Sequence, residues 1–263
     1  MQSAKKYTVI TGASSGIGYE TAKVFADRGK NLIVAARRTE NLESLKHEIL
    51  EKYPALDVVI RTVDLSALEN VYQFYSSLKD FQLETWVNNA GFGNYDSVAH
   101  QDLEKIDTML RLNIEALTIL SSLFVRDYKD VPGTQLINLS SCGGYTIVPT
   151  AVTYCATKFY VSTFTEGLAW ELIESGAKMR AKVLAPAATQ TEFGKNANNV
   201  EQYDYDRAFG TYHTSQQMAA FLIKLYDSDC ILGIVDRETY KVELRSAVFP
   251  YANSSTHNQN PTK

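Results

Sequence analysis

Short apolar runs recur along this chain of 263 residues, and most of them are apolar at consecutive positions instead of alternating with polar residues. Such runs are typical of parallel β-strands that are buried on both faces of a sheet. We therefore predict seven strands, over residues 7–11, 31–36, 57–63, 85–88, 135–139, 181–184 and 230–235.

Between these runs, apolar residues recur at the spacing of amphipathic helices, near 17–29, 39–52, 66–79, 102–129, 151–175 and 215–227. Regular alternation of strand and helix predicts an α/β fold of the Rossmann type. In that fold a doubly wound, seven-stranded parallel sheet has helices on both faces and right-handed crossovers. No repeat or linker interrupts the order, so we expect one domain over residues 1–251.

Two segments break this rhythm. Residues 186–213 form a long connection with weak periodicity, which predicts a lid over a substrate site. Residues 252–263 are polar, and we expect a flexible tail there. Aromatic residues on the lid favour an apolar or ring-bearing substrate, but they equally suit packing of the lid on the body. They are Phe193, Tyr203, Tyr205, Phe209 and Tyr212.

Composition narrows the function classes. The net charge is −4, and no Lys/Arg cluster exceeds a pair, which argues against nucleic-acid binding. Three cysteines without C-x-x-C spacing and four histidines without ligand spacing predict neither a disulfide framework nor a metal site. The N-terminus leaves no room for a signal peptide, and no apolar run approaches the roughly 18 residues of a membrane span. We expect a soluble, cytoplasmic protein with no membrane partner.

A glycine-rich turn follows the first predicted strand and precedes a helix. Glycines let a backbone approach a pyrophosphate, and a helix N-terminus offers free N–H groups and the positive end of its dipole. The alternative is a turn that merely packs the strand on the helix, and the spacing is not G-x-G-x-x-G. The residues expected around the phosphates are Gly12, Ser14, Ser15, Gly16, Ile17 and Gly18.

The end of the second predicted strand indicates which dinucleotide would bind. Where an acidic residue would hold the ribose of NAD, the chain has Arg37 and Arg38. Two guanidinium groups can bind a 2′-phosphate, which predicts NADP(H), although they also suit a solvated strand end. Past the third strand, Asp64 and Leu65 are expected beside the adenine; as the alternative, Asp64 caps the next helix, a role for which Ser66 competes.

Three residues point to carbonyl chemistry. Tyr154 and Lys158 lie one turn apart on a predicted helix, so they share a face, and Ser141 follows the fifth strand. A lysine beside a tyrosine is expected to lower the pKa of the phenol and make it a proton donor and acceptor near neutral pH. Ser141 would hold the substrate oxygen. Taken alone, the pair suits an ordinary surface position; with the glycine turn, it predicts hydride transfer.

Asn113 interrupts the apolar stripe of the predicted helix 102–129, between Leu110 and Leu117. A buried amide costs free energy unless it is hydrogen-bonded. It therefore either satisfies a local backbone kink or holds a water or lysine in a proton path, and the two are compatible.

These motifs, in this order, resemble the short-chain dehydrogenase/reductase (SDR) family, in its branch of roughly 250 residues, over nearly the whole chain. The resemblance implies a catalytic tetrad of Asn113, Ser141, Tyr154 and Lys158 and the cofactor NADP(H). It also implies a homodimer or homotetramer formed through the helices 102–129 and 151–175. The family usually has Pro-Gly where this chain has Pro186 and Ala187. Further cofactor contacts implied are Asn89, Ala90 and Gly91 beside the adenosine, Tyr154 and Lys158, and Pro186, Thr189 and Thr191 over the nicotinamide.

We therefore expect an NADPH-dependent oxidoreductase that reversibly reduces an aldehyde or ketone to an alcohol. Ser141, Tyr145 and Phe193 are the expected substrate contacts. One alternative is a regulator that binds NADP(H) without turnover and signals redox state; another is an enzyme that oxidises alcohols in the cell. Cys142 and Cys155 adjoin the site and suit either oxidant sensing or apolar packing.

Overall fold

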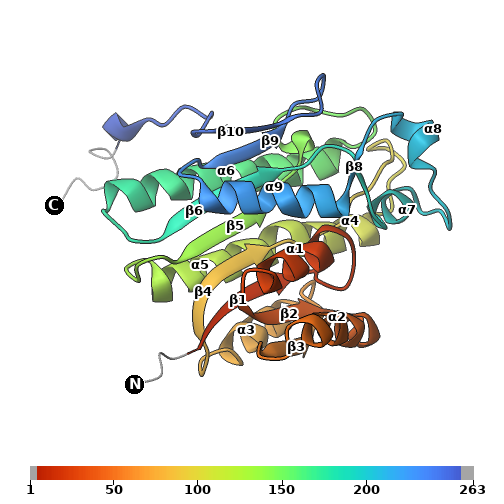
Figure 1. The fold of residues 1–263 in the computed structure, drawn as a ribbon. Coiled ribbons are helices and arrows are strands. Elements are labelled where there is room, and N and C mark those ends of the chain that lie inside the picture. The colour runs from red at the N-terminus through yellow and green to blue at the C-terminus, as the bar shows by residue number, and fades with distance from the viewer. Residues whose placement is uncertain (1–4, 256–263) are drawn as a thin grey trace.

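The predicted strands lie side by side in one sheet of the computed structural model, which describes residues 5–255 (Figure 1). The order across the sheet is β10-β9-β6-β5-β4-β1-β2-β3. Neighbours from β3 to β9 are parallel, as expected. The strands are β1 (Lys6–Thr11), β2 (Asn31–Ala36), β3 (Val58–Thr62), β4 (Gln82–Asn88), β5 (Gln135–Leu139), β6 (Arg180–Ala185), β9 (Leu232–Val235) and β10 (Val242–Arg245).

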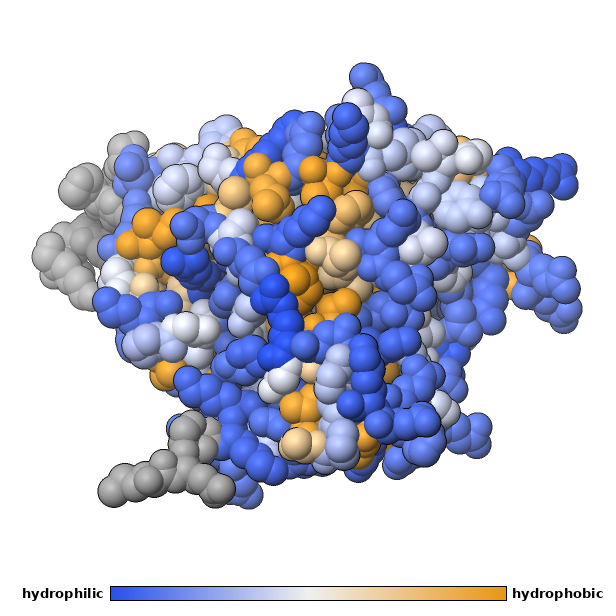
Figure 2. Space-filling view, in the orientation of Figure 1, coloured by the Kyte–Doolittle hydropathy of each residue, from blue (hydrophilic) through white to orange (hydrophobic). Residues whose placement is uncertain are grey.

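Helices cover both faces of the sheet (Figure 1). On one face lie α1 (Gly16–Ala26), α2 (Thr39–Lys52) and α9 (Ser215–Asp227). On the other face lie α3 (Leu68–Ser76), α5 (Leu117–Tyr128) and α6 (Val152–Glu174), with α4 (Leu103–Leu110) packed against the start of α6. The space-filling view shows a largely hydrophilic surface on the α1 and α9 face, with apolar side chains gathered towards its middle (Figure 2).

Two hydrophobic cores explain why the strands are apolar at consecutive positions. Ile10 of β1 packs in the core beneath α1, α2 and α9, whereas its neighbour Val9 packs in the core beneath α3, α5 and α6. Leu32 and Ile33 of β2 divide in the same way. All four side chains are fully buried. The α/β Rossmann-type prediction is confirmed by this architecture.

The sheet has eight strands instead of the predicted seven. β10 pairs antiparallel with β9 at the sheet edge. Its four residues, Val-Glu-Leu-Arg, alternate in polarity and are at least partly exposed. A short edge strand of this kind lacks the buried run that identified the other strands, so the sequence pattern missed it.

The predicted helix 102–129 is not one regular α-helix. A π-helical turn, η1 (Arg111–Ala116), separates α4 from α5 and contains the buried Asn113. By length and composition alone the stretch Leu103–Tyr128 is apolar enough to cross a membrane, contrary to expectation, although core helices of soluble proteins also pass that test. Here its buried side chains, Leu120 and Phe124 among them, pack on the sheet.

The predicted lid, residues 186–213, contains structure of its own. A two-residue parallel ladder joins its two ends, because β7 (Thr189–Gln190) pairs with β8 (His213–Thr214). Between them lie α7 (Phe193–Asn198) and α8 (Tyr205–Phe209), beyond the end of the sheet opposite the start of β1 (Figure 1). The extent of the domain, 1–251, stays a prediction. The predicted flexible tail lies outside the described residues from 256 onward, and residues 253–255 form a short 3₁₀ turn, η3 (Asn253–Ser255).

Candidate active site

A cavity of about 570 Å³ lies at the carboxyl ends of six neighbouring strands. The chain leaves β1, β2, β3, β4, β5 and β6 directly into residues that line it. The chain continues from β1 to β2 and β3 on one side, and from β4 to β5 and β6 on the other, so the strand order reverses between β1 and β4. This edge therefore holds the topological switch point, where α/β sheets bind ligands. The fold thus brings together most of the predicted site residues, which are spread over more than 170 positions of the sequence.

The glycine turn forms one wall. Gly12 has φ +68° and Gly16 φ +58°, in the left-handed region that favours glycine. The side-chain amide of Asn89 donates hydrogen bonds to the carbonyls of Thr11 (2.9 Å) and Gly12 (3.0 Å). Asn89 thus fixes the turn with its side chain, in addition to lining the cavity. A Cβ on Gly18 would lie 2.4 Å from that amide, and Gly18 does not line the cavity, so it serves helix packing.

The N-terminus of α1 opens onto this wall. Its N-cap residue, Ser15, makes no capping hydrogen bond with its side chain, so the first N–H groups of the helix keep their capacity to donate. Together with the glycines, this arrangement fits an anionic pyrophosphate.

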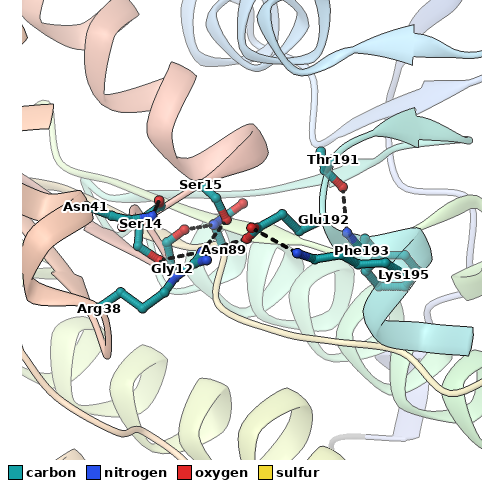
Figure 3. A network of polar contacts seen from close by, with 10 residues as sticks. All are labelled: Gly12, Ser14, Ser15, Arg38, Asn41, Asn89, Thr191, Glu192, Phe193 and Lys195. Carbon is teal, nitrogen blue, oxygen red and sulfur yellow. Dashed lines mark hydrogen bonds and ion pairs between the residues drawn. The ribbon is translucent and has the colours of Figure 1, made fainter. Parts of the chain in front are cut away.

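The hydroxyls of Ser14 and Ser15 are directed towards the second strand's end and not only into the turn. Arg38 donates to Ser14 Oγ at 3.2 Å and to Ser15 Oγ at 2.7 Å (Figure 3). The same guanidinium binds Glu192 of the lid at 2.7 Å.

Arg37 and Asp64 differ from Arg38 in their contacts. Both line the cavity. Among the described residues, no hydrogen bond or ion-pair partner is found for Arg37, whose side chain is exposed. One oxygen of Asp64 accepts from the N–H (2.9 Å) and the hydroxyl (2.7 Å) of Ser66. Neither residue caps the next helix, because α3 has Ala67 as its N-cap, so the capping alternative is wrong. The local turn leaves the second oxygen of Asp64 available to an adenine.

Ser141, Tyr154 and Lys158 line the opposite wall. Ser141 is the N-cap of the 3₁₀ turn η2 (Cys142–Gly144), and its Oγ accepts from Gly143 N at 3.0 Å. Lys158 Nζ donates to the carbonyl of Leu139 at 2.9 Å and lies 5.9 Å from the centroid of the Tyr154 ring. The three side chains therefore face one space, and their catalytic roles stay predictions.

Burial dominates the electrostatics of this wall. It raises the pKa of Tyr154, and the Ser141 side chain acts only as an opposing, smaller influence. Lys158 is not among the influences on this pKa, so the predicted lowering by its charge stays a prediction. Burial also lowers the pKa of Lys158 from 10.5 to about 8. At neutral pH the phenol is protonated and the amine is still largely charged.

Asn113 lies behind this wall, fully buried in the π-helical turn. Its amide accepts from Phe92 N (3.2 Å) and donates to Phe92 O (2.9 Å) and to Thr157 Oγ1 (3.1 Å). Thr157 in turn donates to the carbonyl of Tyr154 at 2.7 Å. Of the alternatives considered for Asn113, the structure favours local backbone satisfaction, and its amide reaches Tyr154 through Thr157.

Aromatic rings enclose the space in front of Tyr154. Its ring centroid lies 5.3 Å from that of Phe193 and 6.4 Å from that of Tyr95. The lid aromatics also pack on one another, with Tyr205 between Tyr203 (4.9 Å) and Phe209 (5.9 Å). The packing interpretation of the lid aromatics is confirmed, and the interpretation that they indicate a ring-bearing substrate stays a prediction. Phe193, Tyr203, Tyr205 and Phe209 line the cavity.

One predicted contact near the site needs correction, and one pair of alternatives can be decided. Tyr145 does not line the cavity: its hydroxyl donates to Glu166 at 2.6 Å and its ring stacks on Phe249. Cys142 is buried, and burial raises the pKa of its thiol to about 11, which favours apolar packing over oxidant sensing. Ala187, by contrast, is accommodated, since it is not among the residues with positive φ.

Sequence reasoning missed several cavity residues. Tyr95 stands on the loop after β4, and Glu192 follows the predicted contact Thr191. Neither residue belongs to a recognisable motif. The only signal in the sequence was that Tyr95 follows the predicted contact Gly91 closely and that Glu192 directly follows Thr191. The remaining cavity residues that were not predicted include Phe92, Leu112, Val148, Lys195, Asn196, Arg237 and Tyr240.

Comparison with known proteins identifies the family of the chain. A family model described as short chain dehydrogenase matches residues 6–202. The human protein "Dehydrogenase/reductase SDR family member 11" is 30% identical over 214 residues, which cover 79% of this chain and 81% of the relative. A sulfoacetaldehyde reductase from Chromohalobacter salexigens is 32% identical over 190 residues, covering 70% of this chain and 72% of the relative.

Solved structures show the same fold. A short-chain dehydrogenase from Sphingobium yanoikuyae in complex with NADPH has a TM-score of 0.79 and 26% identity, covering 87% of each chain. A levodione reductase has a TM-score of 0.79 at 22% identity, covering 89% of this chain and 97% of that one. At that lower identity the likeness concerns the fold alone.

Proposed function

The chain belongs to the short-chain dehydrogenase family, and from that membership we propose that it is an NADP(H)-dependent oxidoreductase that reduces aldehydes or ketones to alcohols. One observation carries the proposal. Ser141, Tyr154 and Lys158 line one wall of the cavity whose other wall contains the glycine turn. A regulator that only bound the cofactor would have no use for these three side chains together in front of an apolar chamber.

The residues present fit a nicotinamide dinucleotide. The glycine turn and the uncapped N-terminus of α1 suit its pyrophosphate, and Arg37 and Arg38 suit a 2′-phosphate. The cofactor would supply the hydride that reduces the carbonyl carbon. Relatives of similar fold are described with NADPH and with NAD, so the preference for NADP(H) rests on the two arginines of this chain.

The protein's own groups would handle the oxygen and the proton. Tyr154, kept protonated by burial, donates its proton to the oxygen as negative charge develops there. Ser141 donates a hydrogen bond to the same oxygen and orients it. The charged amine of Lys158 stabilises the phenolate that forms on Tyr154. In the oxidation direction the same groups act in reverse order.

The cavity favours an uncharged, ring-bearing carbonyl compound. Phe193 and Tyr95 line the space near Tyr154, and Tyr203 lines another part of the same cavity. Such rings contribute apolar area and ring contacts. The hydroxyl of Tyr95 has no hydrogen-bond partner among the described residues, so it is available to a second polar group on the substrate.

Assembly and location belong to the same proposal. We expect a cytoplasmic homodimer or homotetramer in which α4, α5 and α6 of two copies face each other. A shallow apolar groove between these helices, lined by Leu110, Ile114 and Tyr160 among others, suits such a contact. Analytical ultracentrifugation measures the oligomeric state, and a monomer at micromolar concentration would contradict this part of the proposal.

The test is loss of NADPH or NADH absorbance with a panel of aldehydes, ketones and diketones. We expect turnover with NADPH that is lost in Tyr154→Phe and preserved in a matched surface variant, Tyr72→Phe, whose ring is largely exposed. We also expect Arg37→Asp to lower the preference for NADPH over NADH. NADPH binding without turnover on any carbonyl would favour the regulator instead.

A further inference from the structure

Glu192 joins the lid to the phosphate wall of the cavity. Its carboxylate binds Arg38 at 2.7 Å and Lys195 at 3.4 Å. Arg38 at the same time holds the hydroxyls of Ser14 and Ser15, so one guanidinium connects the glycine turn, the end of β2 and the lid (Figure 3). The predicted role of Arg38, binding a phosphate, thus meets a carboxylate of the protein itself.

The backbone around Glu192 is held firmly in place. It follows β7 and Thr191, and a Cβ on Gly16 would lie 2.9 Å from Thr191 Cγ2, so the start of the lid packs directly on the glycine turn. The hydroxyl of Tyr205 accepts from Gly194 N (3.0 Å) and donates to Thr191 O (3.2 Å). These contacts fix the segment on both sides of Glu192, so its position on Arg38 is set by the lid's own structure.

Charge makes Glu192 a competitor for phosphate. Its hydrogen bond with Arg38 lowers the pKa of the carboxyl to about 2, so Glu192 is an anion at every pH at which the protein would be assayed. A planar guanidinium binds either a carboxylate or a phosphate in the same forked geometry. Arg37 makes no hydrogen bond or ion pair among the described residues, and only its longer-range attraction to Asp64 is found, so it is available to a phosphate. Arg38 is already paired with a carboxylate.

We infer that Glu192 is a specificity-determining residue of this enzyme, which competes with the 2′-phosphate of NADP(H) for Arg38. The inference rests on the proposed function, since it presumes that this cavity binds NADP(H). Binding of NADPH then replaces the Glu192–Arg38 ion pair by a contact between the phosphate and Arg38. The lid thereby loses its ion pair to the end of β2. NADH lacks the phosphate, so it leaves the ion pair in place. Glu192 therefore weakens NADPH binding and reduces the enzyme's preference for NADPH over NADH.

The perturbation is Glu192→Gln, which keeps the size of the side chain and removes its charge. The ion pair is partly exposed, with side-chain exposures of 45% for Arg38 and 34% for Glu192, so its contribution is modest. Loss of the competition, and of the repulsion between carboxylate and phosphate, is expected to tighten NADPH binding roughly three- to tenfold at low salt. The expected change for NADH is less than twofold.

Binding is measured by quenching of intrinsic fluorescence, with NADPH and NADH as the probes, on the full chain. Glu201→Gln is the matched control, because Glu201 is an exposed lid glutamate with no hydrogen-bond or ion-pair partner among the described residues. It removes the same charge from the lid without touching Arg38. Arg38→Gln, alone and combined with Glu192→Gln, tests whether the effect on NADPH binding depends on Arg38. Glu192→Ala is a second variant that removes the charge. Circular dichroism checks that each variant is folded.

The inference is supported if Glu192→Gln tightens NADPH alone, Glu201→Gln does not, and the gain disappears in the Arg38→Gln background and shrinks as salt is raised. Equal tightening of NADPH and NADH would overturn it, because Glu192 would then act only by closing the lid. Unchanged or weaker NADPH binding would also overturn it. Failure of the unsubstituted protein to bind NADPH is a different result, which would refute the proposed function itself.

Discussion

The charge on Lys158 predicts the pH dependence of carbonyl reduction. Its amine has a pKa lowered by burial to about 8, and its proposed role needs the charged form. With that pKa, about 0.9 of the amine is charged at pH 7 and about 0.1 at pH 9. We therefore expect kcat for NADPH-dependent reduction to fall roughly tenfold between pH 7 and pH 9. Tyr154 remains protonated over this range because its pKa is raised.

Protein stability changes in the opposite direction over this range. The pKa of Lys158 is lower in the folded protein than its ordinary value of 10.5, so the unfolded chain binds more protons between pH 8 and 10.5. This group therefore makes the folded protein more stable, not less, as the pH rises through that window. A fall in kcat above pH 8 consequently reports loss of the catalytic charge and not unfolding through this group.

The assay is kcat at saturating NADPH and substrate from pH 6 to 10 in buffers of constant ionic strength. Methionine at position 158 has no charge at any pH. We therefore expect Lys158→Met to lower kcat roughly 100-fold or more, and to abolish the fall in kcat near pH 8. Lys182, which does not line the cavity, also has a pKa lowered by burial to about 8, and Lys182→Met is the matched control that keeps the step. A flat profile in the unsubstituted protein, or a step that survives in Lys158→Met, would refute the reasoning.

Three further substitutions test the fold and the cavity. Lys182→Met removes hydrogen bonds of 2.6–2.8 Å from Nζ to three carbonyls at the C-terminus of α9; we expect a loss of about 2–4 kcal/mol in the free energy of unfolding, measured in urea. Asn113→Leu restores the apolar stripe but leaves Phe92 N and O unpaired, so urea denaturation should show a loss of about 2–4 kcal/mol, and an unchanged midpoint would contradict the assigned hydrogen bonds. Phe193→Ala should raise KM for a ring-bearing ketone roughly tenfold with NADPH binding unchanged, since it removes one buried ring contact; an unchanged KM would remove Phe193 from the substrate site.

Much of the site could be predicted because parallel strands deliver their following residues to one edge. The runs ending at Thr11, Ala36 and Leu139 were strongly apolar and buried on both faces, so their ends located the glycine turn, the arginine pair and Ser141. The helical spacing of Tyr154 and Lys158 then fixed their common face. These features depend only on local periodicity and on the order of elements along the chain.

Other features depended on contacts that no local pattern reveals. Glu192 reaches Arg38 across 154 positions, and its sequence context shows nothing but an ordinary lid residue. Tyr145 points to Glu166 and Phe249 because the C-terminal segment packs there, whereas its neighbour Ser141 faces the cavity. The pKa of Tyr154 depends on how deeply the ring is buried, and spacing along a helix does not determine burial.

The most direct test of the central claim follows the hydride itself. The protein is incubated with NADPH that carries deuterium at C4 of the nicotinamide and with a carbonyl compound that it consumes, and the alcohol is analysed by mass spectrometry. We predict one deuterium on the carbinol carbon of the product, and no labelled product with Tyr154→Phe. The experiment is done once with each of the two C4 hydrogens of NADPH replaced by deuterium. An alcohol without deuterium in both experiments would contradict the assignment of this chain as a carbonyl reductase.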